Sequence, residues 1–207
     1  MASTLGDAVR TARTYLNDDG ALVWPDSTII PKAQEAHREL QTMLWNIGSP
    51  VVREQSSPID VATGAIDLGN NQPADMLTPF RIQEYASASA ATTAVDVTES
   101  IFLPLDVAAS TKLVYWAWRK EIITFVPATT DRKVIVYYRK LLTVPRALTD
   151  PIGILFGELY VGARAAAIAH GSVGNKDAYA TLTEVCKNNF DKVVQAQRGQ
   201  QAPPMRP

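Results

Sequence analysis

The stretch YWAWRKEIITF, residues 115–125, gathers three aromatic side chains and two cations within its first six positions. Aromatic rings beside cations are typical of surfaces on which single-stranded nucleic acid stacks its bases. The same alternation also predicts a β-hairpin whose tryptophans, Trp116 and Trp118, belong to a sheet core. Arg119 and Lys120 would then lie at the turn and extend along apolar surface. We interpret the hairpin as structural.

Side chains that could act as a nucleophile, a base or a metal ligand are few. His37 and His170 are the only histidines, and Cys186 is the only cysteine. A Cys186–His170 nucleophilic pair would need a third group to orient it, and the sequence offers no obvious one. One cysteine and two histidines also fall short of a structural zinc site. The sequence therefore predicts no enzyme, no metal site and no cofactor.

Each of these three residues has a simpler structural explanation. His37 lies in the charged run EAHRE, and we expect it on a solvated helix face. His170 lies near a predicted helix C-terminus, where a positive charge is favourable. Cys186 falls on an apolar helical stripe and is expected to be a small core residue.

The charge balance argues against broad nucleic-acid binding. The 207 residues include 20 basic and 21 acidic side chains, for a net charge of -1. Duplex binders usually carry a basic excess, because neutralising phosphates drives their affinity. The most apolar window, residues 152–169, contains Glu158 and Arg164, which favour a buried helix over a membrane span.

Periodicity predicts an α+β fold. Helices are expected from residue 3 or 4 to 16, from Pro31 to 47, from 148 to 170 and from 175 to 197. Gly153, Gly157, Gly162 and the alanines at 165–167 would let another helix approach closely, which favours tight internal packing. Short β-like runs between the helix pairs predict a small antiparallel sheet or a sandwich: residues 51–55, 65–68, 80–85, 113–118, 122–126 and 134–138. Residues 86–98 are expected to be a mobile loop.

The predicted organisation has four parts. Residues 1–50 and 146–198 form the N- and C-terminal helix pairs of one helical bundle. Residues 51–145 form an inserted β-rich domain. Residues 199–207 form an extended tail that is too polar and proline-rich to fold alone.

Four local phrases of the sequence resemble the head-to-tail adaptor, or connector, proteins of tailed bacteriophages. They are ARTYLND at 12–18 with WPD at 24–26 and AQEAHREL at 33–40; QPADMLTP at 72–79 leading to Arg81 and Glu84; WAWR at 116–119 followed by VIVYY at 134–138; and the alanine-rich helix, final helix and proline-containing tail. Together these phrases cover most of the chain.

The resemblance implies a structural virion protein. Such proteins form a homo-oligomeric ring, typically a dodecamer, seated beneath the portal at the capsid vertex. The ring extends the DNA channel, through which genomic DNA passes without sequence-specific binding, and presents a surface to tail or neck proteins. The resemblance implies no membrane contact, synthesis in the host cytoplasm and a final location in the virion neck.

In this family the helical bundle usually forms the ring body, and the C-terminal segment usually reaches into the portal. The resemblance therefore carries a portal-docking role onto part of this chain: Gln197, Arg198, Pro203, Pro204, Met205, Arg206 and Pro207. The two arginines would meet acidic groups of a neighbour, and the proline pair would limit the entropy of the unbound segment. The alternative is a disordered terminus without a partner.

Two other functions stay open at this point. Within the phage class, the chain could be a tail-tube gatekeeper ring. Outside it, the chain could be a monomeric β-domain binding module for single-stranded nucleic acid or a small ligand, with Trp116, Trp118 and Arg119 as its contact residues.

Overall fold

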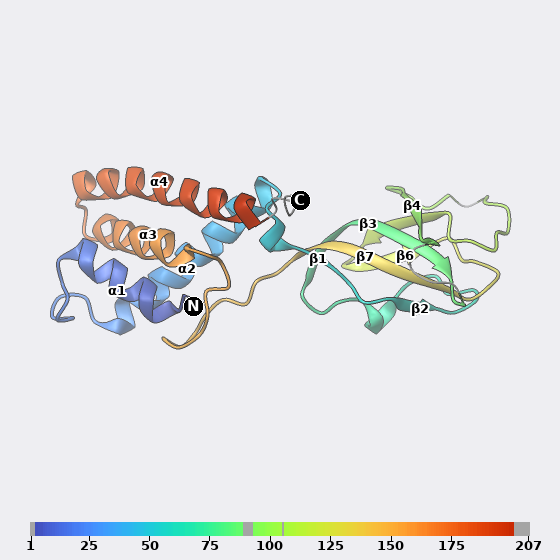
Figure 1. The fold of residues 1–207 in the computed structure, drawn as a ribbon, viewed down its shortest axis with the longest axis horizontal. Coiled ribbons are helices and arrows are strands. Elements are labelled where there is room, and N and C mark those ends of the chain that lie inside the picture. Colours follow the sequence, from blue (N-terminus) through green and yellow to red (C-terminus); the bar gives the residue numbers. More distant parts are fainter. Residues whose placement is uncertain (1–2, 89–92, 105, 201–207) are drawn as a thin grey trace, which may run out of the picture. The chain divides into compact units, whose positions relative to one another are not determined.

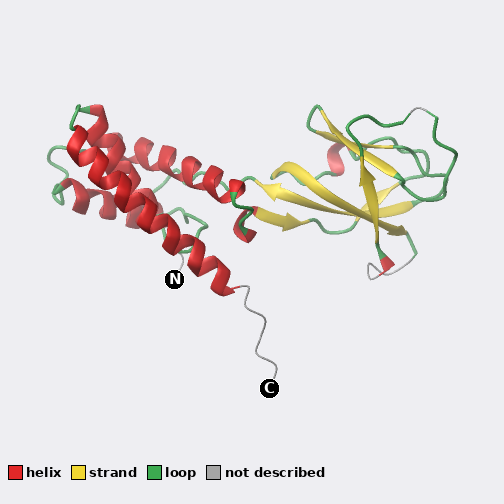
Figure 2. Ribbon diagram, turned by 90° about the horizontal axis from the view of Figure 1, so that it is seen from above, coloured by secondary structure: helices red, strands yellow, loops and turns green. Residues whose placement is uncertain are grey.

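The structure is a computed structural model, and it describes residues 3–88, 93–104 and 106–200 (Figure 1). The fold is α+β, with four α-helices and a curled seven-stranded sheet in these ranges. Contacts divide the chain into two compact units. The helical unit comprises the described residues of Met1–Val52 and Leu142–Pro207, and the β unit comprises those of Arg53–Leu141. The four α-helices fall in the helical unit and the strands in the β unit, and Figure 2 shows helices and strands separated in this way.

Helix α1 (Leu5–Leu16) begins where the sequence predicts. Thr4 caps it, because the Thr4 hydroxyl accepts the Asp7 N–H at 3.3 Å and the Asp7 carboxylate accepts the Thr4 N–H at 2.9 Å. This reciprocal pair satisfies two N–H groups that the helix leaves without partners. Asn17 ends the helix in the left-handed conformation, with φ 53°.

Helix α2 (Asp26–Asn46) begins earlier than the predicted start at Pro31, which lies inside it. A proline there removes one backbone hydrogen bond. The first turn forms nevertheless, because Ile29 is fully buried and Asp26 receives a hydrogen bond from Arg13. These contacts with the rest of the helical unit therefore outweigh the tendency of Pro31 to mark the start of a helix.

Helix α3 (Gly157–Ser172) contacts α1, α2 and α4 (Lys176–Gln200). A Cβ atom on Gly162 would lie 2.6 Å from Thr11 Cβ and 2.7 Å from the Ala8 carbonyl oxygen of α1. Glycine is therefore needed at this crossing, and the predicted tight internal packing is confirmed. Asn175 caps α4, accepting the Ala178 N–H at 3.1 Å. Helix α4 extends to Gln200, into the segment predicted as tail.

The predicted start of α3 near residue 148 is wrong. Residues 146–156 are not helical, since Gly153 has φ 72° and Phe156 has φ 60°. Pro151 also disfavours a helical conformation at the residue before it. The segment pairs with the start of α1 instead, where Leu5 N–H donates to the Asp150 carbonyl oxygen at 2.9 Å.

The β unit contains strands β1 (Arg53–Gln55), β2 (Ile59–Val61), β3 (Met76–Ala86), β4 (Val95–Glu99), β5 (Tyr115–Arg119), β6 (Ile122–Phe125) and β7 (Arg132–Lys140). Their order in the sheet is β1-β7-β3-β4-β5-β6, and β2 also pairs with β7. The β4–β5 pair is parallel and the other pairs are antiparallel, so the prediction of a purely antiparallel sheet is wrong.

Three further strand assignments differ from expectation, and the first is β2, which matches no predicted run. Strand β4 lies in the predicted loop 86–98, because Val97 is buried opposite Ile82 of β3. Residues 65–68 form no strand, but Asp67 makes an isolated bridge to Thr124 and so covers the edge of β6. Residues 89–92 of the predicted loop lie outside the described part of the chain.

Each unit has its own hydrophobic core. In the helical unit, α3 supplies a run of buried small residues: Gly162, Ala163, Ala165, Ala166, Ala167 and Ala169. In the β unit, alternate residues of β7 face the core together with Trp116, Ile123 and Phe125. The same face carries an ion pair between Glu84 and Arg132, which are 2% and 8% exposed.

Candidate interaction surfaces

The β5–β6 hairpin offers little stacking surface. Trp116 is 1% exposed, and its indole N–H donates to the Val97 carbonyl oxygen at 3.2 Å. Trp118 is half-buried against the same core. A base could not reach the Trp116 ring without opening the sheet. The structure therefore places both tryptophans in the scaffold of the β unit.

Arg119 lies at the exposed end of β5 and contacts the segment after β4. Its guanidinium lies 5.0 Å from the centre of the Phe102 ring, a cation–π contact. Ile101 and Phe102 are 84% and 73% exposed, and Ser100 Oγ donates to the Phe102 carbonyl oxygen at 2.6 Å. Sequence reasoning missed this pair of exposed apolar residues, although two large hydrophobic residues after a polar strand end are visible in the sequence.

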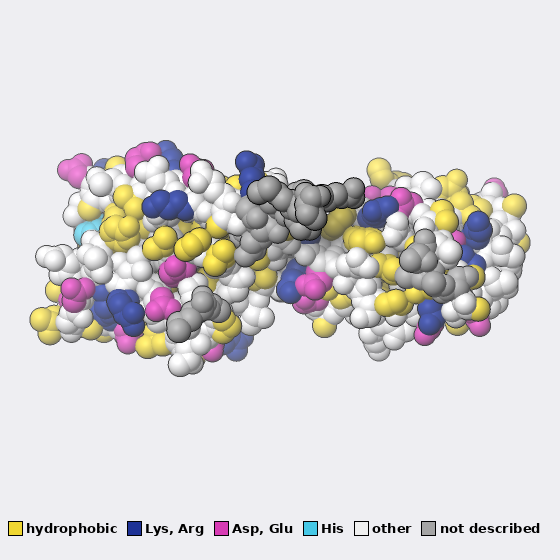
Figure 3. Space-filling model, viewed as in Figure 1, with side chains coloured by type: hydrophobic (Ala, Val, Ile, Leu, Met, Phe, Trp, Pro, Cys, Tyr) yellow, Lys and Arg dark blue, Asp and Glu magenta, His cyan; other side chains and the backbone are white. Residues whose placement is uncertain are grey.

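A second apolar projection lies in the loop between α1 and α2. Leu22 and Val23 are 91% and 71% exposed. We call these two residues the Leu22–Val23 tip. Figure 3 shows hydrophobic side chains at the outer end of this loop, at the lower left of the view. Both aliphatic side chains are left largely in water.

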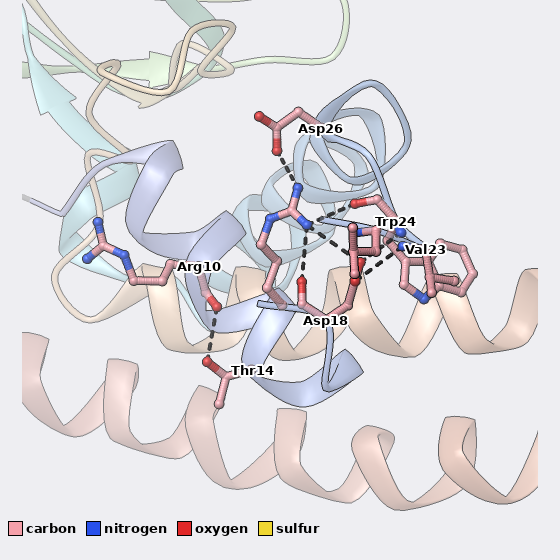
Figure 4. A network of polar contacts seen from close by, with 8 residues as sticks. Arg10, Thr14, Asp18, Val23, Trp24 and Asp26 are labelled. Atoms are coloured by element: carbon pink, nitrogen blue, oxygen red, sulfur yellow. Dashed lines mark hydrogen bonds and ion pairs between the residues drawn. The ribbon is translucent and has the colours of Figure 1, made fainter. Parts of the chain in front are cut away.

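The tip is held by a buried carboxylate (Figure 4). Asp18 is 6% exposed and accepts the backbone N–H groups of Leu22, Val23 and Trp24 at 2.9, 3.2 and 2.7 Å. Burial acts to raise the pKa of Asp18, but these three donors and Arg13 outweigh it, so its pKa is lowered. The carboxylate stays ionised and keeps the loop backbone fixed.

Arg13 ties the same loop to both helices. Its guanidinium donates to the Trp24 carbonyl oxygen at 2.9 Å, to the Asp18 carbonyl oxygen at 3.3 Å and to the Asp26 carboxylate at 2.5 Å. Arg13 is 8% exposed, whereas the Asp26 carboxylate at the far end of this network is half exposed. The sequence phrase ARTYLND followed by WPD contains all these residues, but their contacts could not be deduced from it.

A groove of about 660 Å³ lies between α2, α3 and α4. We call it the Arg164 groove. Arg164 donates to the two carboxylate oxygens of Glu39 at 2.6 and 3.0 Å and lies over the Tyr179 ring at 5.8 Å. The apolar part of its lining includes Met43, Tyr160 and Cys186. The Tyr160 hydroxyl donates to the Met43 sulfur at 3.2 Å.

Cys186 is buried beside this groove, as the sequence predicts. Burial raises the pKa of its thiol to about 11. A thiol with that pKa is almost entirely protonated at neutral pH and is a poor nucleophile. His170 lies elsewhere, half-exposed in the last turn of α3.

The prediction that His37 is solvated is wrong, because the residue is fully buried. Helical period places Ala36, His37 and Leu40 on the inner face of α2, while Glu35 and Arg38 point outward. His37 donates from Nε2 to the Ile152 carbonyl oxygen at 3.0 Å. Burial lowers its pKa, which favours the neutral ring.

The predicted portal-docking residues fall in two groups. Gln197 is 3% exposed within α4, and Ser49 Oγ donates to its side-chain oxygen. Arg198 is exposed in the last turn of the same helix. The other five lie outside the described residues: Pro203, Pro204, Met205, Arg206 and Pro207.

Within the described ranges, no group of three or more His, Cys, Asp or Glu side chains could hold a metal ion. None of the helices in those ranges is long and apolar enough to span a membrane. The described surface of the helical unit presents the Leu22–Val23 tip and the Arg164 groove, and that of the β unit presents Ile101 and Phe102.

A comparison with protein families identifies the class to which the chain belongs. The model of the family described as SU10 adaptor protein matches residues 3–207, so the chain belongs to that family. It is a family of phage head-to-tail adaptors, which are structural proteins rather than enzymes. The resemblance noted in the sequence is thereby confirmed. The curated proteins include no match to this chain.

Proposed function

We propose that the chain forms a ring, with twelve subunits as is typical of such adaptors, that docks beneath the portal. The ring extends the DNA channel and links the capsid to the tail, and the protein resides in the virion neck. The observation that carries this proposal is the family match across residues 3–207. It covers the helical unit and the β unit alike, so both would take part in the adaptor.

In this proposal the four helices act as one bundle and form the body of the ring. Helix α3 contacts each of the other three helices, and Gly162 brings it close to α1. Such a closely packed unit deforms little, because protein interiors are as dense as organic crystals. A rigid body suits a subunit that must meet its neighbours at one fixed angle.

The C-terminal segment docks into the portal in this proposal. Gln197 is buried against Ser49, so its role would be to anchor the end of α4 rather than to touch the portal. The segment from Arg198 to Pro207 would then start from a fixed position. Arg198 and Arg206 would pair with acidic groups of the portal.

The near-neutral charge suits a DNA conduit. With 20 basic and 21 acidic residues, the chain has no general excess of cations with which to hold phosphates. A channel through which DNA must slide would be slowed by strong phosphate contacts. DNA passage therefore requires no sequence-specific site.

The docking role can be tested by deleting residues 199–207. We expect the shortened chain to keep its circular dichroism spectrum and melting temperature, because the described core of the helical unit lies outside the deletion. We expect it to lose co-sedimentation with purified portal rings.

A charge variant sharpens this test. Arg206→Glu should weaken portal binding, whereas Lys192→Glu, on an exposed part of α4, should leave it unchanged. Normal binding by the shortened chain would show that the docking assignment is wrong. Electron microscopy of the purified chain with portal would report ring formation independently.

A further inference from the structure

We infer that the Leu22–Val23 tip of one subunit inserts into the Arg164 groove of a second copy. The inference rests on the proposed ring and identifies the contact that would close it. Neighbours in a ring meet through two different surfaces, one from each copy. The helical unit carries both a projection and a hollow, so every copy could offer one to each neighbour.

The tip has the properties of a contact residue pair rather than of a connecting loop. Leu22 and Val23 are 91% and 71% exposed, yet their backbone N–H groups are bound by the buried Asp18 carboxylate. Ala21, directly before them, adopts a left-handed φ of 56°. This conformation is uncommon for alanine and costs free energy that the surrounding structure must supply.

Fixing the loop before contact favours binding. A flexible loop would lose conformational entropy on docking, whereas this loop is already ordered by Asp18 and Arg13. Its two aliphatic side chains therefore face solvent in a defined position. Covering them with a neighbour would remove apolar surface from water at little ordering cost.

The groove offers a complementary surface. Its apolar lining includes Met43, Tyr160 and Cys186, and its volume of about 660 Å³ leaves room for two aliphatic side chains. The Arg164–Glu39 pair is already formed, so docking need not leave either charge without a partner.

Charge at the rim favours the tip as occupant. Asp19, three residues before Leu22 in the same loop, is exposed, and Arg38 and Lys187 are exposed at the groove. Glu35 lies at the same rim and Lys187 is paired with Glu184, so Arg38 is the cation best placed to meet Asp19. Opposite charges at an interface edge fix orientation more than affinity.

The tip cannot enter the groove of its own copy. The tip lies before the first residue of α2, Asp26, whereas Glu35 is the first groove residue along that helix. At about 1.5 Å per helical residue, Asp26 and Glu35 are about 14 Å apart along α2, so the tip is separated from the groove by at least part of that helix. Because Asp18 and Arg13 fix the loop, a second copy must supply the occupant.

Disulfide trapping tests the contact directly. Cys186 is the only native cysteine, so C186A gives a cysteine-free background. In that background, V23C and T183C place one thiol on the tip and one in the groove lining. Oxidation of the full-length protein in its assembled state should yield disulfide-linked dimers and longer ladders on non-reducing gels.

The matched control is V23C with T181C, since Thr181 is an exposed residue of α4 outside the groove lining. It should give less than a tenth of the crosslinked product. Equal crosslinking by both pairs, or rings without crosslinks from the T183C pair, would overturn the inference while leaving the ring intact. Absence of rings in electron micrographs of the virion would instead overturn the proposed function.

A second set of variants measures how strongly the contact contributes to subunit association. L22A with V23A should weaken subunit association on the order of 30-fold, the effect of losing one interface hot spot. V173A removes an aliphatic side chain that is 62% exposed in the same unit and should have no effect. If the tip variant loses portal binding but its copies still assemble, the occupant is the portal and the inference is wrong.

Discussion

The crossing of α1 and α3 allows a sharp prediction, because a single methyl group should disrupt it. A Cβ on Gly162 would lie 2.6 Å from Thr11 Cβ, 2.7 Å from Thr11 Cγ2 and 2.7 Å from the Ala8 carbonyl oxygen. Two of these atoms are fixed to the α1 backbone, so a rotamer change cannot relieve the contacts. G162A should therefore force the two helices apart.

The size of the effect follows from two opposing contributions. Overpacking of this kind costs about 1–3 kcal/mol. Alanine improves helix propensity by about 1 kcal/mol relative to glycine. Because the contacts involve backbone atoms, we place the overpacking cost at the upper end and expect the free energy of unfolding to fall by about 2 kcal/mol.

The assay is urea unfolding followed by far-ultraviolet circular dichroism, which reports mainly on the helices. The control is G171A, where the nearest atom to the added Cβ is a ring carbon of Tyr179 at 3.1 Å, and that side chain can move. G171A should change the free energy of unfolding by less than about 1 kcal/mol. A G162A protein as stable as the wild type would refute the assigned close approach of α1 and α3.

Three further predictions concern buried polar groups. Burial lowers the pKa of His37 below its ordinary 6.5, so as the pH falls the unfolded chain binds a proton before the folded chain does. The free energy of unfolding should therefore fall as the pH drops below about 6.5. H37Q should flatten this pH dependence in urea titrations between about pH 7 and pH 5. E84A leaves Arg132 buried without its partner and should cost about 3–5 kcal/mol, whereas E84L combined with R132L should recover most of that loss in thermal melts. Cys186, whose pKa is raised to about 11, should react with a thiol reagent at least about tenfold more slowly in the native chain than in urea, and equal rates would contradict its burial.

Local signals in the sequence predicted those elements that local physics determines. Helix α1, expected from residue 3 or 4 to 16, spans Leu5–Leu16, and its Thr4–Asp7 cap involves residues only three positions apart. The β5–β6 hairpin follows from its alternating residues and turn. Gly162 was correctly assigned to close internal packing.

The errors came from contacts between residues distant in the sequence. The helical period of α2 already places His37 beside Ala36 and Leu40, but its hydrogen-bond partner, the Ile152 carbonyl, lies more than a hundred positions further along the chain. Strand β4 forms because Val97 pairs with Ile82 of β3, although the residues of the segment before it are small and polar. Helix α2 begins before Pro31 because Arg13 and Asp26 meet there.

The candidate surfaces were the least predictable part. Leu22 and Val23 resemble any apolar pair in the sequence, and only the three hydrogen bonds to Asp18 show that they are held outward. The Arg164 groove combines side chains from three helices, so no single segment indicates it. By contrast, the adaptor resemblance was spread over short phrases along the whole chain, which is why it was visible without a structure.

The central claim, a ring beneath the portal, is tested most directly by cryo-electron microscopy of the virion neck. We predict a closed ring of this chain between portal and tail, with helices of neighbouring copies in contact. Density for isolated copies only, or for this chain at a site away from the portal vertex, would contradict it.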